Sequence, residues 1–233
     1  MDLNYCSMKC PVGKKVSSEL LDKHESVFGA ALAFEVFTNK CAETCQYKAE
    51  LEKENHKLKV CCISAKARHG KDTAGAMMAE YLESKGKKVL ITHFADLVKY
   101  VCTKFFGWNG DKDEAGRTLL QHIGTDVVGD KQPEYWANFI VDILKFFENE
   151  WDYVLIPDCR YPWEVSTMED NFETVVLRVE RPGFESNLTE AQKQHASEVM
   201  MDDYPFDAIL YNDSDLDTFK DKVEWFVDNY LIN

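Results

Sequence analysis

One strand–loop–helix segment constrains the fold of this chain more than any other feature. A short apolar run over 58–64 leads through a basic loop at 65–70 into good helix formers over 74–85. Gly86 then predicts the end of the helix, and a second apolar run covers 87–92. A strand, a helix and a strand in this order form a βαβ unit, which predicts a buried parallel sheet.

The alternation of strands and helices continues to the end of the chain and predicts an α/β domain with five strands. The further predicted strands are 153–157, 174–179 and 207–211, and the further predicted helices are 97–106, 115–123, 135–150 and 216–230. Residues 17–56 carry apolar side chains at three- and four-residue steps, which predicts helix. We therefore expect a helical N-terminal extension over 1–57 and the α/β domain over 58–233.

The charge of the 233-residue chain is unevenly distributed. The net charge of −14 argues against binding to nucleic-acid polymers, and the 45% hydrophobic content is that of a globular protein. Residues 57–88 nevertheless carry +5, whereas residues 183–233 carry −9. This pattern favours a small anionic ligand bound at one place. The longest apolar stretch, Val27–Phe37, is too short to span a membrane.

The eight cysteines divide into two groups with different expected roles. Cys61, Cys62, Cys102 and Cys159 lie in or near apolar runs and are predicted to be buried thiols. Buried thiols and the absence of a secretory signal indicate a reducing cytoplasm. A four-thiolate zinc site is permitted by the spacing of the remaining four, although two of them also continue an apolar stripe as core residues. These four are Cys6, Cys10, Cys41 and Cys45.

The loop before the helix follows the phosphate-binding pattern G-x-x-x-x-G-K-[S/T] with two departures. Gly70 and Lys71 match, Ala65 replaces the first glycine, and Asp72 occupies the hydroxyl position with Thr73 next to it. Backbone N–H groups at the start of a helix bind anions, and the lysine adds a full charge. The alternative is a basic, exposed turn. The predicted phosphate-binding residues are Ala67, Arg68, His69, Gly70, Lys71, Asp72 and Thr73.

A carboxylate that follows a predicted strand offers a second ligand for a metal. Asp158 comes directly after the strand at 153–157, a position that holds Mg²⁺ in phosphate-loop proteins. Asp72 or Thr73 is the other candidate ligand. Arg160 is placed to contact a phosphoryl group. The alternatives are an Asp158–Arg160 pair that closes a turn, or a pair between Arg160 and Glu164.

Two other groups of polar residues lie where a nucleotide could be bound. Arg117, Gln121 and Thr125 share one helix face, which suits a monophosphate and the edge of a base but is also typical of a solvated face. Arg181 begins a polar segment, 183–196, that we interpret as a lid. Its only cations are Lys193 and His195, and His195 has a local hydrogen bond with Glu198 as its alternative role. Arg178 is expected to be buried against an acid.

Several segments together resemble the deoxynucleoside monophosphate kinases of tailed bacteriophages and their bacterial relatives. The resemblance covers about residues 58–230, and its specificity comes from the shared order and spacing of the segments. It implies a three-layer P-loop NTPase fold and transfer of the γ-phosphate of ATP to a (deoxy)nucleoside monophosphate with Mg²⁺. The matching segments are 63–73, 93–99, 119–126, Tyr135-Trp136, 152–160, 179–183, 195–198 and 211–213.

The resemblance also implies roles for individual residues. The implied catalytic residues are Lys71, Arg117, Asp158, Arg160 and Arg181. The implied acceptor-binding residues are Phe94, Asp96, Lys99, Arg117, Gln121, Thr125 and Trp136. From the residues alone, Asp96 is equally a helix N-cap and Trp136 equally a core side chain. We expect small nucleotides as binding partners, and neither a nucleic-acid polymer nor a membrane. We expect the protein to be located in the cytoplasm, which is that of the host cell if a phage encodes the chain. A homodimer is possible.

The sequence is also compatible with two other functions. One is a kinase of the same fold whose acceptor is dephospho-coenzyme A or a phosphorylated metabolite. The other is a nucleotide-binding regulatory module without catalysis, because the loop is altered at Ala65 and Asp72 and the lid segment contains no arginine.

Overall fold

The computed structural model describes residues 58–232 except 112, 130, 148–149 and 187. Its strands are β1 (Lys59–Ala65), β2 (Val89–Ile91), β3 (Tyr153–Ile156), β4 (Glu173–Glu180) and β5 (Ala208–Tyr211). They form one sheet in the order β2-β3-β1-β4-β5, and all four neighbouring pairs are parallel. The predicted parallel five-stranded sheet is therefore confirmed.

Both faces of the sheet are buried, because alternate residues of each strand point to opposite sides. On β1, Cys61 and Ile63 face one core, whereas Val60 and Cys62 face the other. These four side chains are at most 1% exposed. A strand that is buried on both sides needs a continuous apolar run, which is why the pattern of 58–64 was informative.

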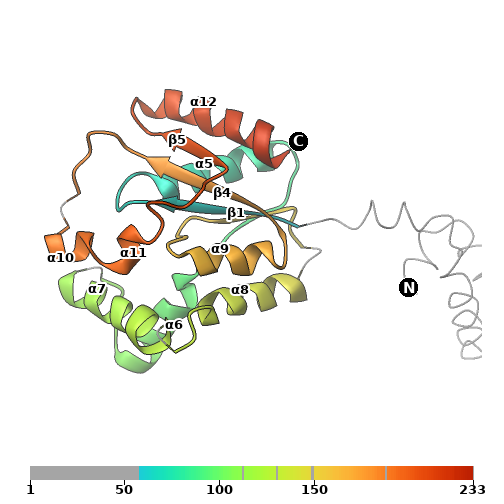
Figure 1. Ribbon diagram of the computed structural model, residues 1–233. Helices are drawn as coiled ribbons and strands as arrows, with labels where there is room; N and C mark the ends of the chain where they lie inside the picture. The colour runs from blue at the N-terminus through green and yellow to red at the C-terminus, as the bar shows by residue number, and fades with distance from the viewer. Residues whose placement is uncertain (1–57, 112, 130, 148–149, 187, 233) are drawn as a thin grey trace, which may run out of the picture. The chain divides into compact units, whose positions relative to one another are not determined.

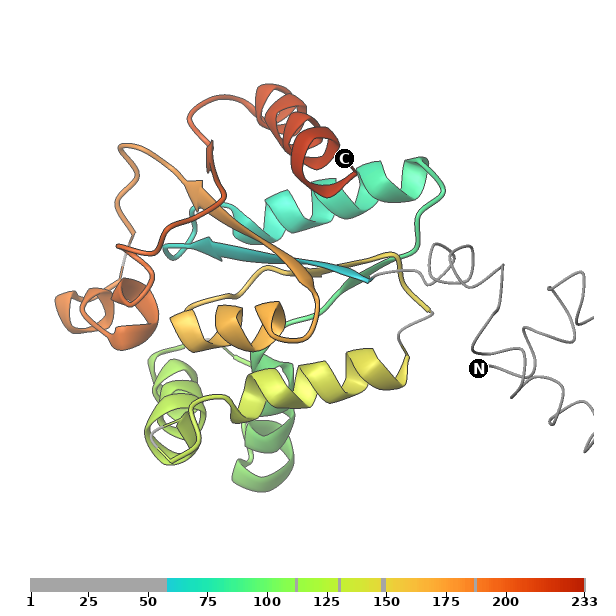
Figure 2. The ribbon, with the colours of Figure 1, turned by 45° about the vertical axis from the view of Figure 1, so that its right-hand side comes forward.

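Helices cover both faces and complete three layers (Figures 1 and 2). The core on one face joins the sheet to α5 and α12 through Met78 and Phe219, and the core on the other face joins it to α8 and α9 through Ile140 and Val165. The helices are α5 (Lys71–Ser84), α6 (Ala95–Phe106), α7 (Glu114–Gln121), α8 (Tyr135–Phe146), α9 (Pro162–Glu169), α10 (Glu190–Lys193), α11 (Ala196–Val199) and α12 (Leu216–Phe226).

A third, smaller core lies among α6, α7, the start of α8 and the π-helix η1 (His122–Gly129), which continues from α7. Val98, Cys102, Ile123 and Trp136 are its buried members. A second π-helix, η2 (Val227–Leu231), continues from α12.

Most predicted elements are present, with shifted ends. The helix predicted over 115–123 is α7 followed by η1, and the helix predicted to reach residue 150 ends as α8 at Phe146. Neither α9 nor the two short helices α10 and α11 were predicted. The predicted helical extension over 1–57 and the cysteines at 6, 10, 41 and 45 lie outside the described residues.

The four other cysteines are buried and unpaired, as predicted. No helix in the described part of the chain has the length and apolar content that a membrane span requires.

Candidate active site

The loop between β1 and α5 is closed by two residues in the left-handed region. Gly70 has φ = 107° and Arg68 has φ = 65°. A Cβ atom on Gly70 would lie 2.7 Å from Nδ2 of Asn212, which itself donates to the carbonyl oxygen of His69 at 3.0 Å. A larger residue at position 70 would therefore be strained by the backbone conformation and would displace the side-chain amide of Asn212.

The first turn of α5 carries an ion pair that extends to the start of α6. Lys71 Nζ lies 2.8 Å from both carboxylate oxygens of Asp72, and Nε2 of His93 lies 3.8 Å from Asp72 Oδ1. The contact with His93, followed by the Lys71 ammonium, holds the pKa of Asp72 well below its usual range. The same contact raises the pKa of His93. Asp72 is therefore a carboxylate at neutral pH, available to a cation.

Asp158, two residues after the end of β3, holds the N-terminus of α6 in place. Its two carboxylate oxygens accept the backbone N–H groups of Phe94 and Ala95 at 2.9 and 3.0 Å. Each carboxylate oxygen keeps a second lone pair after accepting one hydrogen bond. The carboxylate can therefore still accept from a metal-bound water.

Glu164, in the first turn of α9, is a buried carboxyl group beside Asp158. Its Oε2 accepts the backbone N–H of Arg160 at 2.7 Å and that of Tyr161 at 3.0 Å. Burial, followed by the charge of Asp158, raises the pKa of Glu164 to about 8. Glu164 therefore contacts Arg160 through the backbone N–H, which differs from the side-chain pair given above as one alternative.

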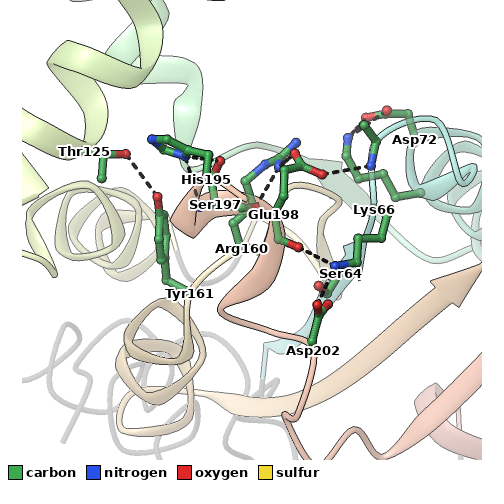
Figure 3. Close-up of polar contacts among 12 residues, drawn as sticks. Ser64, Lys66, Asp72, Thr125, Arg160, Tyr161, His195, Ser197, Glu198 and Asp202 are labelled. Carbon is green, nitrogen blue, oxygen red and sulfur yellow. Dashed lines mark hydrogen bonds and ion pairs between the residues drawn. The ribbon is translucent and has the colours of Figure 1, made fainter. Parts of the chain in front are cut away.

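The guanidinium of Arg160 instead points toward α11, as Figure 3 shows. Its Nη1 donates to the carboxylate of Glu198 and, at 2.9 Å, to the carbonyl oxygen of Ser197. The other carboxylate oxygen of Glu198 accepts the N–H of Ala67, in the phosphate loop, at 3.1 Å. Glu198 therefore connects Arg160 to the phosphate loop.

A cavity of about 270 Å³ joins the start of α5 to α6, α7, η1 and α11. Ten of the predicted site residues line it: Lys71, Asp72, Phe94, Lys99, Arg117, Gln121, Thr125, Trp136, Asp158 and Arg160. Seven do not: Ala67, Arg68, His69, Gly70, Thr73, Asp96 and Arg181. Residues that sequence reasoning did not name as site residues also line it, among them His93, Tyr161, Leu188, Gln192, Ser197 and Glu198.

The far wall of the cavity combines polar and aromatic groups. Arg117, Gln121 and Thr125 all line it, so the predicted shared face looks into a cavity and not into open solvent. Thr125 Oγ1 lies 3.0 Å from the hydroxyl of Tyr161. Trp136 is 8% exposed and donates from Nε1 to the carbonyl oxygen of Gly124 at 2.9 Å. Trp136 thus belongs to the core and presents one edge to the cavity.

Some predicted phosphate ligands are engaged elsewhere or lie outside the cavity. The N–H of Ala67 donates to Glu198, and the guanidinium of Arg181 lies 4.7 Å from the centre of the Phe184 ring. Thr73, in the first turn of α5, is exposed and Arg68 is also exposed. Their roles as phosphate ligands stay predictions.

Other polar residues have partners that decide between their alternative roles. Asp96 accepts the N–H of His93 at 3.0 Å and pairs with Lys99 at 2.8 Å, so it lies within the first turn of α6 and is not its N-cap. Arg178 is 5% exposed and pairs with Asp202 at 3.2 Å, which confirms that it is buried against an acid. The ring of His195 caps α11 by accepting the N–H of Ser197. The local hydrogen bond between His195 and Glu198 is present through the backbone, because the His195 carbonyl oxygen accepts the N–H of Glu198 at 2.8 Å.

The protein has a parallel sheet covered by helices on both faces, a glycine–lysine loop before a helix, and a cavity that starts at that lysine. Together these features define a P-loop protein of the kinase type. The family model for deoxynucleotide monophosphate kinase matches residues 83–223. The chain belongs to the deoxynucleotide monophosphate kinase family, whose members are phosphotransferases.

Two curated relatives carry the same description. The deoxynucleotide monophosphate kinase of Enterobacteria phage T4 is 26% identical over 230 residues, covering 95% of this chain and 88% of the relative. That alignment extends into residues 1–57, which the motif segments had left outside the resemblance. The deoxynucleotide monophosphate kinase of Escherichia phage RB69 is 29% identical over 110 residues, 46% of this chain and 43% of the relative.

Solved structures give more distant matches. An APS kinase of Mycobacterium tuberculosis in complex with AMPPNP and APS has a TM-score of 0.42 and 10% identity, covering 74% of this chain and 96% of that one. Shikimate kinase from Acinetobacter baumannii has a TM-score of 0.42 and 11% identity, covering 77% and 98%. At these scores the two structures carry no weight in the assignment.

Proposed function

We propose that this protein transfers the γ-phosphoryl group of ATP to a deoxynucleoside monophosphate and so forms the diphosphate. The observation that carries the proposal is one cavity with the phosphate-loop lysine at one end and the Arg117–Gln121–Thr125 face at the other. Direct transfer between two nucleotides requires both to be held in line within one enclosed space. Membership of the deoxynucleotide monophosphate kinase family favours a deoxynucleotide as the acceptor.

The donor end of the cavity is built for a polyphosphate. The N-terminus of α5 presents N–H groups and the positive end of its helix dipole. The Lys71 ammonium, which pairs with Asp72 in this structure, would pair with a phosphate oxygen when ATP is bound. Gly70 allows the backbone to turn tightly before the helix. ATP would therefore be bound over residues 70–73, with its terminal phosphate toward Lys71.

The oxygen ligands at this end suit Mg²⁺. Mg²⁺ keeps several of its waters and is bound through one or two carboxylates together with substrate phosphates. Asp158 and Asp72 both line the cavity, and each offers carboxylate oxygens with unused lone pairs. When bound there, Mg²⁺ would neutralise charge on the transferring phosphates.

The acceptor end matches the chemistry of a nucleoside monophosphate. A guanidinium binds a phosphate through two parallel hydrogen bonds, which assigns the acceptor phosphate to Arg117. The amide of Gln121 and the hydroxyls of Thr125 and Tyr161 are donors and acceptors for a base or sugar. Phe94 and Trp136 add apolar surface on which a ring can pack.

The reaction requires no general base, because the attacking group is already an anionic phosphate oxygen. Catalysis then consists of alignment and of positive charge near the transferring group. Lys71 and Arg160 supply that charge from within the cavity. Arg181 remains a prediction as a further contributor from the segment after β4. The four unpaired thiols of the described part suit the reducing cytoplasm in which we expect the enzyme to act.

The proposal is tested by a coupled assay of ADP release from ATP with each common deoxynucleoside and ribonucleoside monophosphate as acceptor. Dephospho-coenzyme A is included as the acceptor of a related activity. We expect ADP release with at least one deoxynucleoside monophosphate and none without an acceptor. Turnover with dephospho-coenzyme A alone, or with no acceptor at all, would contradict the proposal.

A further inference from the structure

The short helix α11 binds both of the loops that carry positive charge into the cavity. On the phosphate-loop side, Lys66 Nζ donates to the carbonyl oxygen of Glu198 at 2.9 Å and Ala67 N–H donates to its Oε2 at 3.1 Å. On the other side, Arg160 Nη1 donates to the Ser197 carbonyl oxygen and to Glu198 Oε1. The side chain of Glu198 is 10% exposed and lines the cavity.

A carboxylate is the side chain that can make both contacts of Glu198 at once. Its two oxygens each accept a hydrogen bond, one from the Ala67 N–H and one from the Arg160 guanidinium. A charge-assisted hydrogen bond in a nearly buried place restricts both partners more strongly than a neutral one. The orientation of the Arg160 guanidinium is thus fixed relative to the phosphate loop, which holds the donor nucleotide in the function proposed above.

We propose that Glu198 is a positioning residue for phosphoryl transfer, which aligns Arg160 with the phosphate loop. The inference rests on the proposed function, because it assigns Arg160 to the transferring phosphoryl group. A displacement of about 1 Å at a positioned group can lower the rate by about 100-fold. The effect of losing Glu198 therefore appears in kcat more than in the KM of either nucleotide.

A second set of contacts keeps this region folded when Glu198 is changed. Lys66 Nζ also pairs with Asp202 at 2.5 Å, and Asp202 pairs with the buried Arg178 at 3.2 Å. Arg178 in turn donates to Ser64 of β1 at 3.2 Å. The substitution E198Q preserves the shape of the side chain and leaves these contacts in place. The amide of glutamine has only one acceptor oxygen, so its NH₂ group would face either the Ala67 N–H or the Arg160 guanidinium, and that hydrogen bond is lost.

The test compares wild-type protein with E198Q, E198D and R160K, the double variant E198Q/R160K, and E190Q as a matched control. Glu190 is an exposed glutamate of α10 that pairs with Lys193 and does not line the cavity. We expect E198Q to lower kcat by about 10- to 100-fold, with KM values changed less than about threefold and an unchanged melting temperature. E198D, which keeps the charge, recovers part of the loss, and E190Q behaves as wild type.

The double variant separates a positioning role from a merely structural one. If Glu198 acts through Arg160, adding E198Q to R160K lowers kcat by less than about threefold more. The inference would be overturned if the kcat losses of E198Q and R160K multiply in the double variant. It would also be overturned if E198Q has wild-type kcat, including the case in which its only change is tighter binding of ATP. Absence of turnover in the wild-type protein would instead contradict the proposed function, and the positioning role with it.

Discussion

The carboxyl group of Glu164 accepts the backbone N–H of Arg160 at 2.7 Å from a position that is only 8% exposed. It thereby fixes the backbone that carries Arg160 into the cavity, while Glu198 fixes the guanidinium. Burial and the neighbouring Asp158 raise the pKa of Glu164 from 4.5 to about 8. The group is therefore mostly protonated at neutral pH, and its charged form costs stability.

The raised pKa of Glu164 predicts how stability depends on pH. Between about pH 4.5 and 8 the folded protein binds a proton at this site that the unfolded chain has lost, so the free energy of unfolding falls as pH rises through that window. E164Q keeps an oxygen for the two N–H groups but cannot ionise. In the wild-type protein the free energy of unfolding should fall by a few kcal/mol across this pH window, since each pKa unit corresponds to about 1.4 kcal/mol, and we expect this fall to be absent in E164Q.

Urea unfolding of wild-type protein, E164Q and the exposed control E190Q at pH 5, 6, 7 and 8 measures this difference. E190Q should follow the wild-type curve and E164Q should lie above it at pH 8. Parallel curves for all three proteins would mean that Glu164 is ionised throughout the window.

Replacing Lys71 tests whether the cavity is catalytic or only binds nucleotide. K71A removes the charge at the start of α5, and we expect kcat for ADP release to fall about 100- to 1,000-fold with the fold intact, because electrostatic stabilisation of the transferring group is lost. K85A removes another lysine at the end of α5, which pairs with Asp228, and should retain wild-type activity. A K71A variant with wild-type kcat would exclude the phosphate loop from the chemistry.

Replacing Arg117 tests the acceptor end separately. In R117A we expect the KM for the monophosphate to rise about 10- to 100-fold, the range of a lost charge-assisted contact, while the KM for ATP changes less than threefold. Initial rates with each substrate varied in turn give both constants. K104A, a change of an exposed lysine on α6, is the control. An equal rise in both KM values would indicate a general disturbance of the cavity.

The conformation of Gly70 predicts that replacing it by alanine lowers the stability of the fold more than the same replacement at Gly86. G70A introduces a Cβ at φ = 107° and 2.7 Å from Asn212 Nδ2, whereas G86A introduces one at φ = 76° into open space. We expect G86A to cost about 1 kcal/mol from backbone strain alone and G70A to cost about 2 to 3 kcal/mol. Chemical denaturation measures both, and equal losses would mean that Asn212 moves aside without cost.

The parts of the fold that could be predicted are those whose burial is indicated by residues close together in the sequence. The run Val60–Ile63 is buried on both faces of the sheet, and Gly86 and Gly107 end their helices with positive φ. The helix α9 was not predicted, because two of its buried residues, Glu164 and Thr167, are polar, so the apolar residues alone do not show a helical period over its eight residues. Its available signals are Pro162 in the first turn and Glu164, which accepts the N–H of Tyr161 just before it.

The site residues divide in the same way between local and distant causes. Lys71 and Asp158 were predictable, because a phosphate loop before a helix and a carboxylate after a strand are local patterns. Glu198 lies in the motif segment 195–198 and is otherwise predicted only as a local partner of His195, whereas its side-chain partners are 38 residues away at Arg160 and 131 residues away at Ala67. His93 lies within a motif segment, yet its contact with Asp72 connects α5 to the residues just before α6, which only the fold brings together.

The most direct test of the account is ³¹P NMR of the reaction of the wild-type protein with ATP, Mg²⁺ and the deoxynucleoside monophosphate that gives the fastest ADP release. We predict that the deoxynucleoside diphosphate appears one for one with ADP, without inorganic phosphate, and that K71A produces neither at a comparable rate. ADP formed with inorganic phosphate and no new diphosphate would contradict it, because the γ-phosphoryl group would then be transferred to water.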